Sequence, residues 1–156
     1  MQRFMPGLLV LSLLLAEVTL ASPEQVVESF HKALISAMQE ATDETRRAIV
    51  DEAINSYFQV HTIARISLGR NWRTLQSDKQ SDYMTLMEEL ISTTYASRFA
   101  KFDNQTFTVT SSSPIASNRA RVKSILNTKS ELVNLDYQLQ FSEESWRIYD
   151  IVANGV

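Results

Sequence analysis

The sequence of 156 residues contains no cysteine, only two histidines, and only three glycines and three prolines. A chain without cysteine forms no disulfide and offers neither a thiol nucleophile nor a thiolate ligand for zinc. Beyond residue 21 its only glycines are Gly69 and Gly155, so it has no glycine-rich phosphate loop. Its serines lack the glycine-flanked setting of a nucleophile elbow. These absences argue against the common classes of catalytic site.

The chain also lacks an excess of positive charge, because its formal net charge is −3. A slightly acidic protein has no electrostatic reason to bind the phosphates of nucleic acid. It also lacks the polybasic attraction by which peripheral proteins bind anionic lipid surfaces. We therefore expect neither a nucleic-acid partner nor stable insertion into a membrane.

Residues 1–21 have the pattern of a secretory signal peptide. Arg3 provides the positive start, residues 8–15 form a short apolar core, and residues 19–21 match a small-x-small cleavage site. The apolar core is shorter than the about 20 residues that span a bilayer. We therefore predict export, with Ser22 as the first residue of a single domain over 22–156; a retained anchor or an ordinary N-terminal helix is the alternative. Without a cysteine after the cleavage site, no lipid anchor is expected.

Residues 22–101 have the pattern of four helices. The first begins at residues 22–25, where Ser22 and Gln25 can form a capping box around a proline suited to the first helical position. A second helix begins at residue 42 or 43, and a short third one over 61–68 ends at Gly69. The long fourth helix, about 78–101, has an apolar stripe wide enough to cover a sheet. Its members are Tyr83, Leu86, Met87, Leu90, Ile91, Thr94, Tyr95, Arg98, Phe99 and Phe102.

After residue 105 the hydrophobic period changes to two, which predicts strands. The strands are expected over 106–110, 120–126, 133–141 and 145–153, joined by short links that suit an antiparallel meander. The third strand alternates most clearly, so one face of the sheet should be buried and the other wet. Helices followed by strands predict an α+β fold, with N-terminal helices packed on a curved four-stranded antiparallel sheet.

Three segments resemble one known family in their order and spacing. They are HTIARISLGRNW at 61–72, the fourth helix with its aromatic residues, and WRIYDIVANGV at 146–156. Together they resemble the MlaC family of periplasmic phospholipid-binding proteins, also called toluene-tolerance auxiliary proteins, over about residues 48–156. The resemblance implies a cystatin-like or nuclear-transport-factor-like cone that encloses a pocket. In the family a serine and a helical tail usually follow the last strand, so we expect a domain that lacks this tail.

The resemblance also implies a function. Such proteins are periplasmic carriers that shuttle phospholipid between the inner and outer membranes and maintain the lipid asymmetry of the outer membrane. Their partners are phospholipid, an inner-membrane lipid transporter complex and an outer-membrane lipoprotein complex. Neither catalysis nor a cofactor or metal is implied.

A carrier of this kind needs a dry apolar cavity. Roughly thirty methylenes in two acyl chains, at about 0.8 kcal/mol each, amount to on the order of 25 kcal/mol of hydrocarbon transfer. On the resemblance, we expect apolar side chains of the third and fourth helices and of the sheet to line the lipid pocket. These are Ile63, Leu68, Tyr83, Met87, Leu90, Ile91, Tyr95, Val122, Leu135, Tyr137, Leu139, Trp146 and Ile148.

Asp150 is the acid that needs an explanation. Strict alternation places it on the same strand face as Trp146 and Ile148, pointing inward. A buried carboxylate must be paired or protonated. We expect a structural ion pair with one of the arginines at positions 65, 70, 73 or 98. The alternative is a general base in a pocket enzyme of the same architecture, and a third possibility is an interaction module without a ligand.

The two histidines receive structural interpretations. His31 falls on the polar side of the first helix and is expected to be solvated. His61 opens the third helix, where we expect a structural or capping role.

Overall fold

The structure is a computed structural model that describes residues 20–154. Residues 1–19, which include most of the predicted signal peptide, and residues 155–156 lie outside the described part. The elements are α1 (Pro23–Gln39), α2 (Asp43–Tyr57), α3 (Val60–Leu68), the 3-10 helix η1 (Gly69–Thr74), α4 (Ser77–Arg98), β1 (Thr106–Ala116), β2 (Arg119–Asn127), β3 (Leu132–Ser142) and β4 (Ser145–Ala153). No helix within residues 20–154 combines the length and apolar character needed to cross a bilayer.

The helices begin where local signals place them, with one exception. Ser22 caps α1, because its hydroxyl accepts a hydrogen bond from the backbone of Gln25 at 3.3 Å while the Gln25 side chain accepts one from Ser22 at 2.8 Å. The capping box is therefore confirmed. The exception is α4, in which Ser77 is already helical and Gln76 is the N-cap residue, without a side-chain cap. The helix ends at Arg98, three residues before its predicted end, since Phe99 leaves the helical conformation.

The strands form one antiparallel sheet in the order β1-β2-β3-β4. The predicted α+β fold is therefore confirmed, with β1 six residues longer than expected and β2 and β3 each two residues longer. In β3, Leu135, Tyr137 and Leu139 are buried on the inner face, while the residues between them are more exposed. The register carries this inner face across to β2 and β4, since Val122 lies opposite Tyr137 and Ile148 opposite Leu139.

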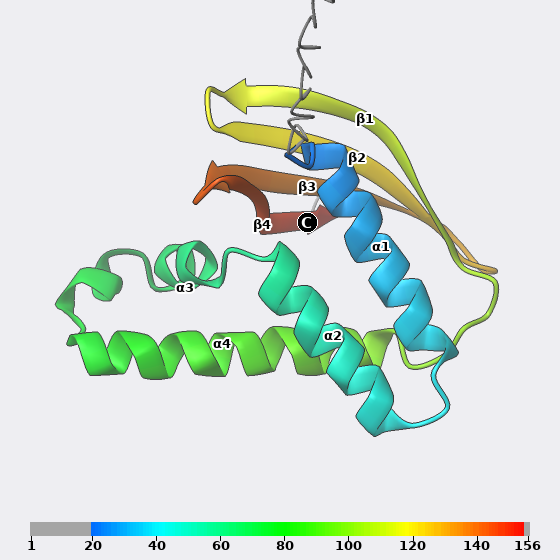
Figure 1. Ribbon diagram of the computed structural model, residues 1–156, viewed down its shortest axis with the longest axis horizontal. Coiled ribbons are helices and arrows are strands. Elements are labelled where there is room, and N and C mark those ends of the chain that lie inside the picture. Colours follow the sequence, from blue (N-terminus) through cyan, green and yellow to red (C-terminus); the bar gives the residue numbers. More distant parts are fainter. Residues whose placement is uncertain (1–19, 155–156) are drawn as a thin grey trace, which may run out of the picture.

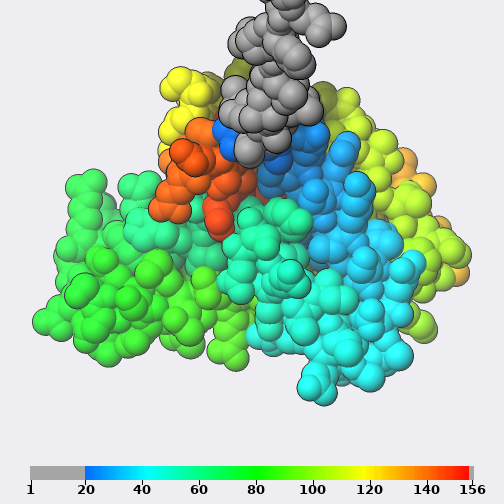
Figure 2. Space-filling model, viewed as in Figure 1, coloured from blue at the N-terminus to red at the C-terminus, as the bar shows by residue number. Residues whose placement is uncertain are grey.

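The helices are unevenly placed over the sheet. Helix α1 packs on β1, β2 and β4, whereas α4 packs chiefly against α2 and α3 (Figure 1). In the space-filling view, α1 (blue) lies in front of part of the sheet, and parts of β1 (yellow to yellow-green) and β4 (orange to red) stay visible (Figure 2). The long α4 therefore lies at the edge of the molecule.

An aromatic cluster centred on Phe30 joins these elements. The Phe30 ring of α1 is fully buried and meets Phe58, Tyr95 and Tyr137 edge-on, with ring centroids 5.0, 5.3 and 6.4 Å away. Such pairs contribute about 0.5–1.5 kcal/mol each beyond the area they bury. The residue after Phe58 adds a backbone bond, because Gln59 donates its N–H to the carbonyl of Ile148 at 2.8 Å. The cluster thus ties α1, α4 and the start of α3 to the sheet.

His31 is buried, so the prediction of a solvated side chain was wrong. It is 5% exposed, its Nε2 lies 2.9 Å from the Tyr137 hydroxyl, and its ring stacks on Phe107 at 4.3 Å. The apolar face of α1 is wider than the sequence stripe, because β1 and β3 both reach this side of the helix. Burial lowers the pKa of His31 to about 4 and raises the pKa of Tyr137. The imidazole is therefore neutral at neutral pH.

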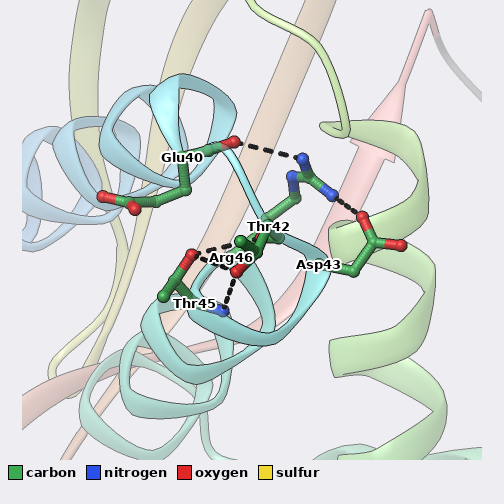
Figure 3. A network of polar contacts seen from close by, with 5 residues as sticks. All are labelled: Glu40, Thr42, Asp43, Thr45 and Arg46. Atoms are coloured by element: carbon green, nitrogen blue, oxygen red, sulfur yellow. Dashed lines mark hydrogen bonds and ion pairs between the residues drawn. The ribbon is translucent and has the colours of Figure 1, made fainter.

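Arg46 connects the end of α1 to the start of α2 (Figure 3). Its guanidinium donates to the backbone oxygen of Glu40 at 3.2 Å and to the carboxylate of Asp43. The side chain of Thr42 caps α2 by accepting a hydrogen bond from the backbone of Thr45 at 3.1 Å. These bonds fix the connection between α1 and α2. Because α4 packs on α2, they also help to fix the position of α4.

The filled part of the core should be sensitive to truncation. Leu139 is fully buried, so Leu139→Ala should lower the free energy of unfolding by about 2–5 kcal/mol in a urea titration. Leu90 is 60% exposed on α4, and Leu90→Ala should change the same quantity by less than about 0.5 kcal/mol. Equal effects of the two substitutions would contradict this placement of the core.

His31 should make the stability of the protein depend on pH. Its folded pKa of about 4 lies below the unfolded value near 6.5, so the unfolded chain takes up the proton first as the pH falls. The stability contributed by the neutral ring is present above about pH 6.5 and is lost toward pH 4. Between pH 7 and pH 5 the free energy of unfolding should fall by about 2 kcal/mol from this group. In urea titrations, the free energy of unfolding of His31→Gln should not show this part of the decrease. An identical pH dependence in both proteins would refute a buried, neutral His31.

Candidate functional site

A cavity of about 500 Å³ lies between the C-terminal half of α4 and the inner face of the sheet. Its size falls within the about 300–1,000 Å³ of small-molecule sites. Most of its lining is apolar and comes from α1, α4, the Phe99 cap and all four strands. The apolar lining residues are Leu34, Tyr95, Phe99, Phe107, Leu126, Val133, Leu135, Tyr137, Ile151 and Ala153.

The cavity exists because side chains on the two sides do not meet. On the α4 side, the rings of Tyr95 and Phe99 stack with centroids 5.8 Å apart and form a flat aromatic wall. On the sheet side, Val133, Ile151 and Ala153 are partly or fully accessible, and the last of these is a small residue. Because α4 is held by α2 and α3, these short side chains cannot close the remaining distance.

The charged groups of the cavity lie at its rim. Thr94, Arg98 and Glu131 line the cavity and are themselves exposed, so they mark its opening to solvent. Among the described residues that line the cavity, only Arg98 and Glu131 are charged. Inside, burial raises the pKa of Tyr95, and the nearby positive charge of Arg98 partly opposes this rise. The tyrosine hydroxyls therefore stay neutral, and the interior offers a surface for hydrocarbon rather than for ions.

A second hollow of about 690 Å³ lies between α1 and β1. It shares Gln105 and Phe107 with the cavity and is bounded on the α1 side by His31 and Ile35. The stacked rings of His31 and Phe107 stand where the two spaces adjoin. The apolar surface available to a long ligand therefore extends beyond the cavity itself.

Within residues 20–154, no group of three or more histidine, cysteine or acidic side chains is arranged to hold a metal ion. The cavity itself contains no acid and base placed side by side, as a proton-transfer site needs. Its chemistry is that of a binding site with a charged edge.

The structure brings only some of the predicted pocket residues to the cavity. Tyr95, Leu135 and Tyr137 line it. Val122, Leu139 and Ile148 are fully buried among other side chains and contribute to the filled core. Ile63, Met87, Ile91 and Trp146 are partly buried and pack against that core without lining the cavity.

The remaining predicted residues lie on other surfaces. Leu90 is 60% exposed, so it faces solvent and not the sheet. Tyr83 joins α4 to α3 through a 3.0 Å contact between its hydroxyl and that of Ser67, and Leu68 is half-buried at the end of α3. The apolar stripe predicted for α4 is wider than the face of the helix that is turned toward the sheet. Residues at the outer edge of the stripe therefore remain at the surface.

Several lining residues were not predicted as such. Phe107, Leu126 and Val133 follow from the alternation of their strands, which places them on the inner face. Leu34 follows from the apolar stripe of α1. The sequence signal showed that these side chains point inward, but not that a hollow lies in front of them.

Asp150 points outward, so its predicted inward orientation was wrong. The pairing shifts from Gln138–Asp150 to Leu139–Ile148, which leaves Tyr149 as an extra residue in β4. This bulge changes the alternation, and the carboxylate of Asp150 accepts a 2.7 Å hydrogen bond from Gln138 at an exposed site. The expected ion pair is absent from those found among residues 20–154.

Comparisons with known proteins agree with this geometry. A phospholipid-binding protein from Ralstonia solanacearum, solved in complex with a phospholipid, is similar with a TM-score of 0.77 and 23% identity, over 87% of this chain and 80% of that one. At this identity the likeness shows the fold alone. Among curated protein sequences, none is similar enough to count as a match. The family model described as MlaC protein matches residues 24–156. The chain therefore belongs to the MlaC family.

Proposed function

We propose that this protein binds a phospholipid with its acyl chains in the cavity between α4 and the sheet. The observation that carries the proposal is the apolar cavity of about 500 Å³. Among its lining residues within 20–154, only Arg98 and Glu131 are charged, and both are exposed at its edge. The Ralstonia protein of the same fold was solved with a phospholipid, which supports a ligand of this class. Membership of the MlaC family points the same way.

The energetics favour hydrocarbon as the ligand. Each methylene moved from water to an apolar site gains about 0.8 kcal/mol, so long acyl chains supply a large driving force. A polar ligand would gain little from the aromatic wall of Tyr95 and Phe99 or from the aliphatic residues opposite it. The hollow beside α1, which adjoins at Phe107, offers further apolar surface for chains that exceed the cavity.

The biological role that we propose is transport. A periplasmic carrier would receive phospholipid at one membrane, shield its chains during diffusion, and release it at the other, which would maintain the lipid asymmetry of the outer membrane. An inner-membrane lipid transporter complex and an outer-membrane lipoprotein complex would be its partners. The family membership and the signal-peptide pattern of residues 1–21 support this role.

Catalysis is the weaker hypothesis. It depended on Asp150 as an acid or base inside the cavity, and that residue is exposed on the outer face of the sheet. The geometry therefore favours a binding protein.

A bulky side chain in the cavity should displace the lipid. Ala153 lines the cavity and is itself exposed, so Ala153→Trp should fold while filling part of the space. Overpacking of about 1–3 kcal/mol corresponds to a loss of about 5- to 150-fold in affinity. Organic extraction and mass spectrometry of the purified protein should show correspondingly less phospholipid per chain.

Leu90→Trp is the matched control, because it introduces the same side chain on the exposed face of α4. It should retain the phospholipid content of the unaltered protein. If Ala153→Trp folds and still has a normal lipid content, the phospholipid must bind at another site. An unaltered protein that neither co-purifies with phospholipid nor takes it up from vesicles would refute the carrier function.

A further inference from the structure

The rim of the cavity carries one cation and one anion on opposite walls. Arg98 is the last residue of α4, and Glu131 belongs to the connection between β2 and β3. Both side chains line the cavity and are exposed. Every other lining residue among those described is uncharged, so these two groups are the charges that line the cavity.

Glu131 is held in place by its own turn. The backbone oxygen of Glu131 accepts hydrogen bonds from the backbone and the hydroxyl of Thr128, each at 3.0 Å. In return, the Thr128 hydroxyl accepts one from the backbone N–H of Glu131 at 3.1 Å. An ion pair between Lys129 and Asp103 attaches this turn to the connection between α4 and β1. The two walls of the rim are therefore joined, and the carboxylate of Glu131 projects from an ordered turn.

Arg98 has a charge that is not neutralised within the described part of the chain. The ion pairs found there involve other residues, and neither Arg98 nor Glu131 takes part in them. The positive charge of Arg98 is nevertheless close enough to Tyr95 to act on its hydroxyl. Arg98 thus lines the cavity near the aromatic wall and is also exposed to solvent.

We propose that Arg98 and Glu131 form a head-group subsite that favours zwitterionic phospholipids, whose head group ends in a cation, over anionic ones. The proposal rests on the phospholipid-binding function proposed above. With the acyl chains in the cavity, the phosphodiester lies at the rim, where the planar guanidinium of Arg98 donates hydrogen bonds to its oxygens. The ammonium group of an ethanolamine head group then reaches the carboxylate of Glu131.

The pair of charges determines the selectivity. Arg98 alone would attract every phospholipid, because all of them carry the phosphodiester charge. Glu131 adds attraction for a head group that ends in a cation and leaves a glycerol head group without that gain, while it opposes additional negative charge. Selectivity therefore depends on Glu131 and general affinity on Arg98, which makes the two roles separable by experiment.

The test uses delipidated protein and vesicles of phosphatidylcholine that contain labelled phosphatidylethanolamine or labelled phosphatidylglycerol. The label bound to the re-isolated protein is measured at low and at high salt. The unaltered protein should take up phosphatidylethanolamine about fivefold better, since exposed charge pairs contribute up to about 1 kcal/mol. Glu131→Gln should bring this ratio close to one. Arg98→Gln should lower uptake of both lipids by about fivefold, and Arg98→Lys should restore part of it.

Matched controls are Arg70→Gln and Glu144→Gln, which remove exposed charges that do not line the cavity. They should leave both uptake and the ratio unchanged, and all variants should keep the melting temperature of the unaltered protein. High salt should reduce the preference of the unaltered protein, because the interactions are exposed. Inorganic phosphate should not displace bound lipid, because it lacks the acyl chains that hold the ligand.

The outcomes separate this inference from the carrier function. Uptake of neither lipid by the unaltered protein would refute the carrier function itself. The head-group subsite would be refuted if the unaltered protein, Glu131→Gln and Arg98→Gln all took up lipid normally and with the same ratio of phosphatidylethanolamine to phosphatidylglycerol. The carrier function would then still stand. Displacement of lipid by inorganic phosphate would also overturn the subsite, because it would show a site for the free anion.

Discussion

The inner face of the sheet is covered unevenly by the helices, and the rest of the molecule depends on this constraint. Helix α1 packs directly on the strands, whereas α4 is held at the edge by α2 and α3. Where α1 lies close, Val122, Leu139 and Ile148 form a filled core. Where the C-terminal half of α4 faces the strands, the same kind of apolar surface surrounds a hollow. One hydrophobic sheet face thus stabilises the fold at one end and provides a binding surface at the other.

The boundary between the cavity and the hollow beside α1 includes a polar pair. The contact between His31 and Tyr137 provides each of two buried polar groups with a partner, which avoids the free energy of leaving either unpaired. The stacked ring of Phe107 continues this boundary to β1. Burial keeps the His31 ring neutral, so no charge arises where the two spaces adjoin. Among the described residues that line the cavity, the charged ones are Arg98 and Glu131, which are exposed at its rim. An apolar interior with a charged edge is the arrangement that an amphipathic lipid requires.

Local patterns in the sequence predicted much of the fold and less of the site. The capping box at Ser22 and the alternation of β3 depend on neighbours within a few residues, so they could be read directly. Asp150 was misplaced because one extra residue in β4 changes the alternation, and that bulge arises from pairing with β3. Leu90 was misplaced because a wide apolar stripe does not show which of its members faces the sheet.

The sequence by itself determined where the helices and strands lie and which family the chain resembles, since caps, periods and spacings are local properties. Only the tertiary structure decided which inward side chains touch one another and which face an empty space. That outcome depends on how closely α4 approaches the strands, and α2 and α3 set this distance through contacts far apart in the chain. The same arrangement placed Arg98 and Glu131, which come from separate elements, on the rim of one cavity.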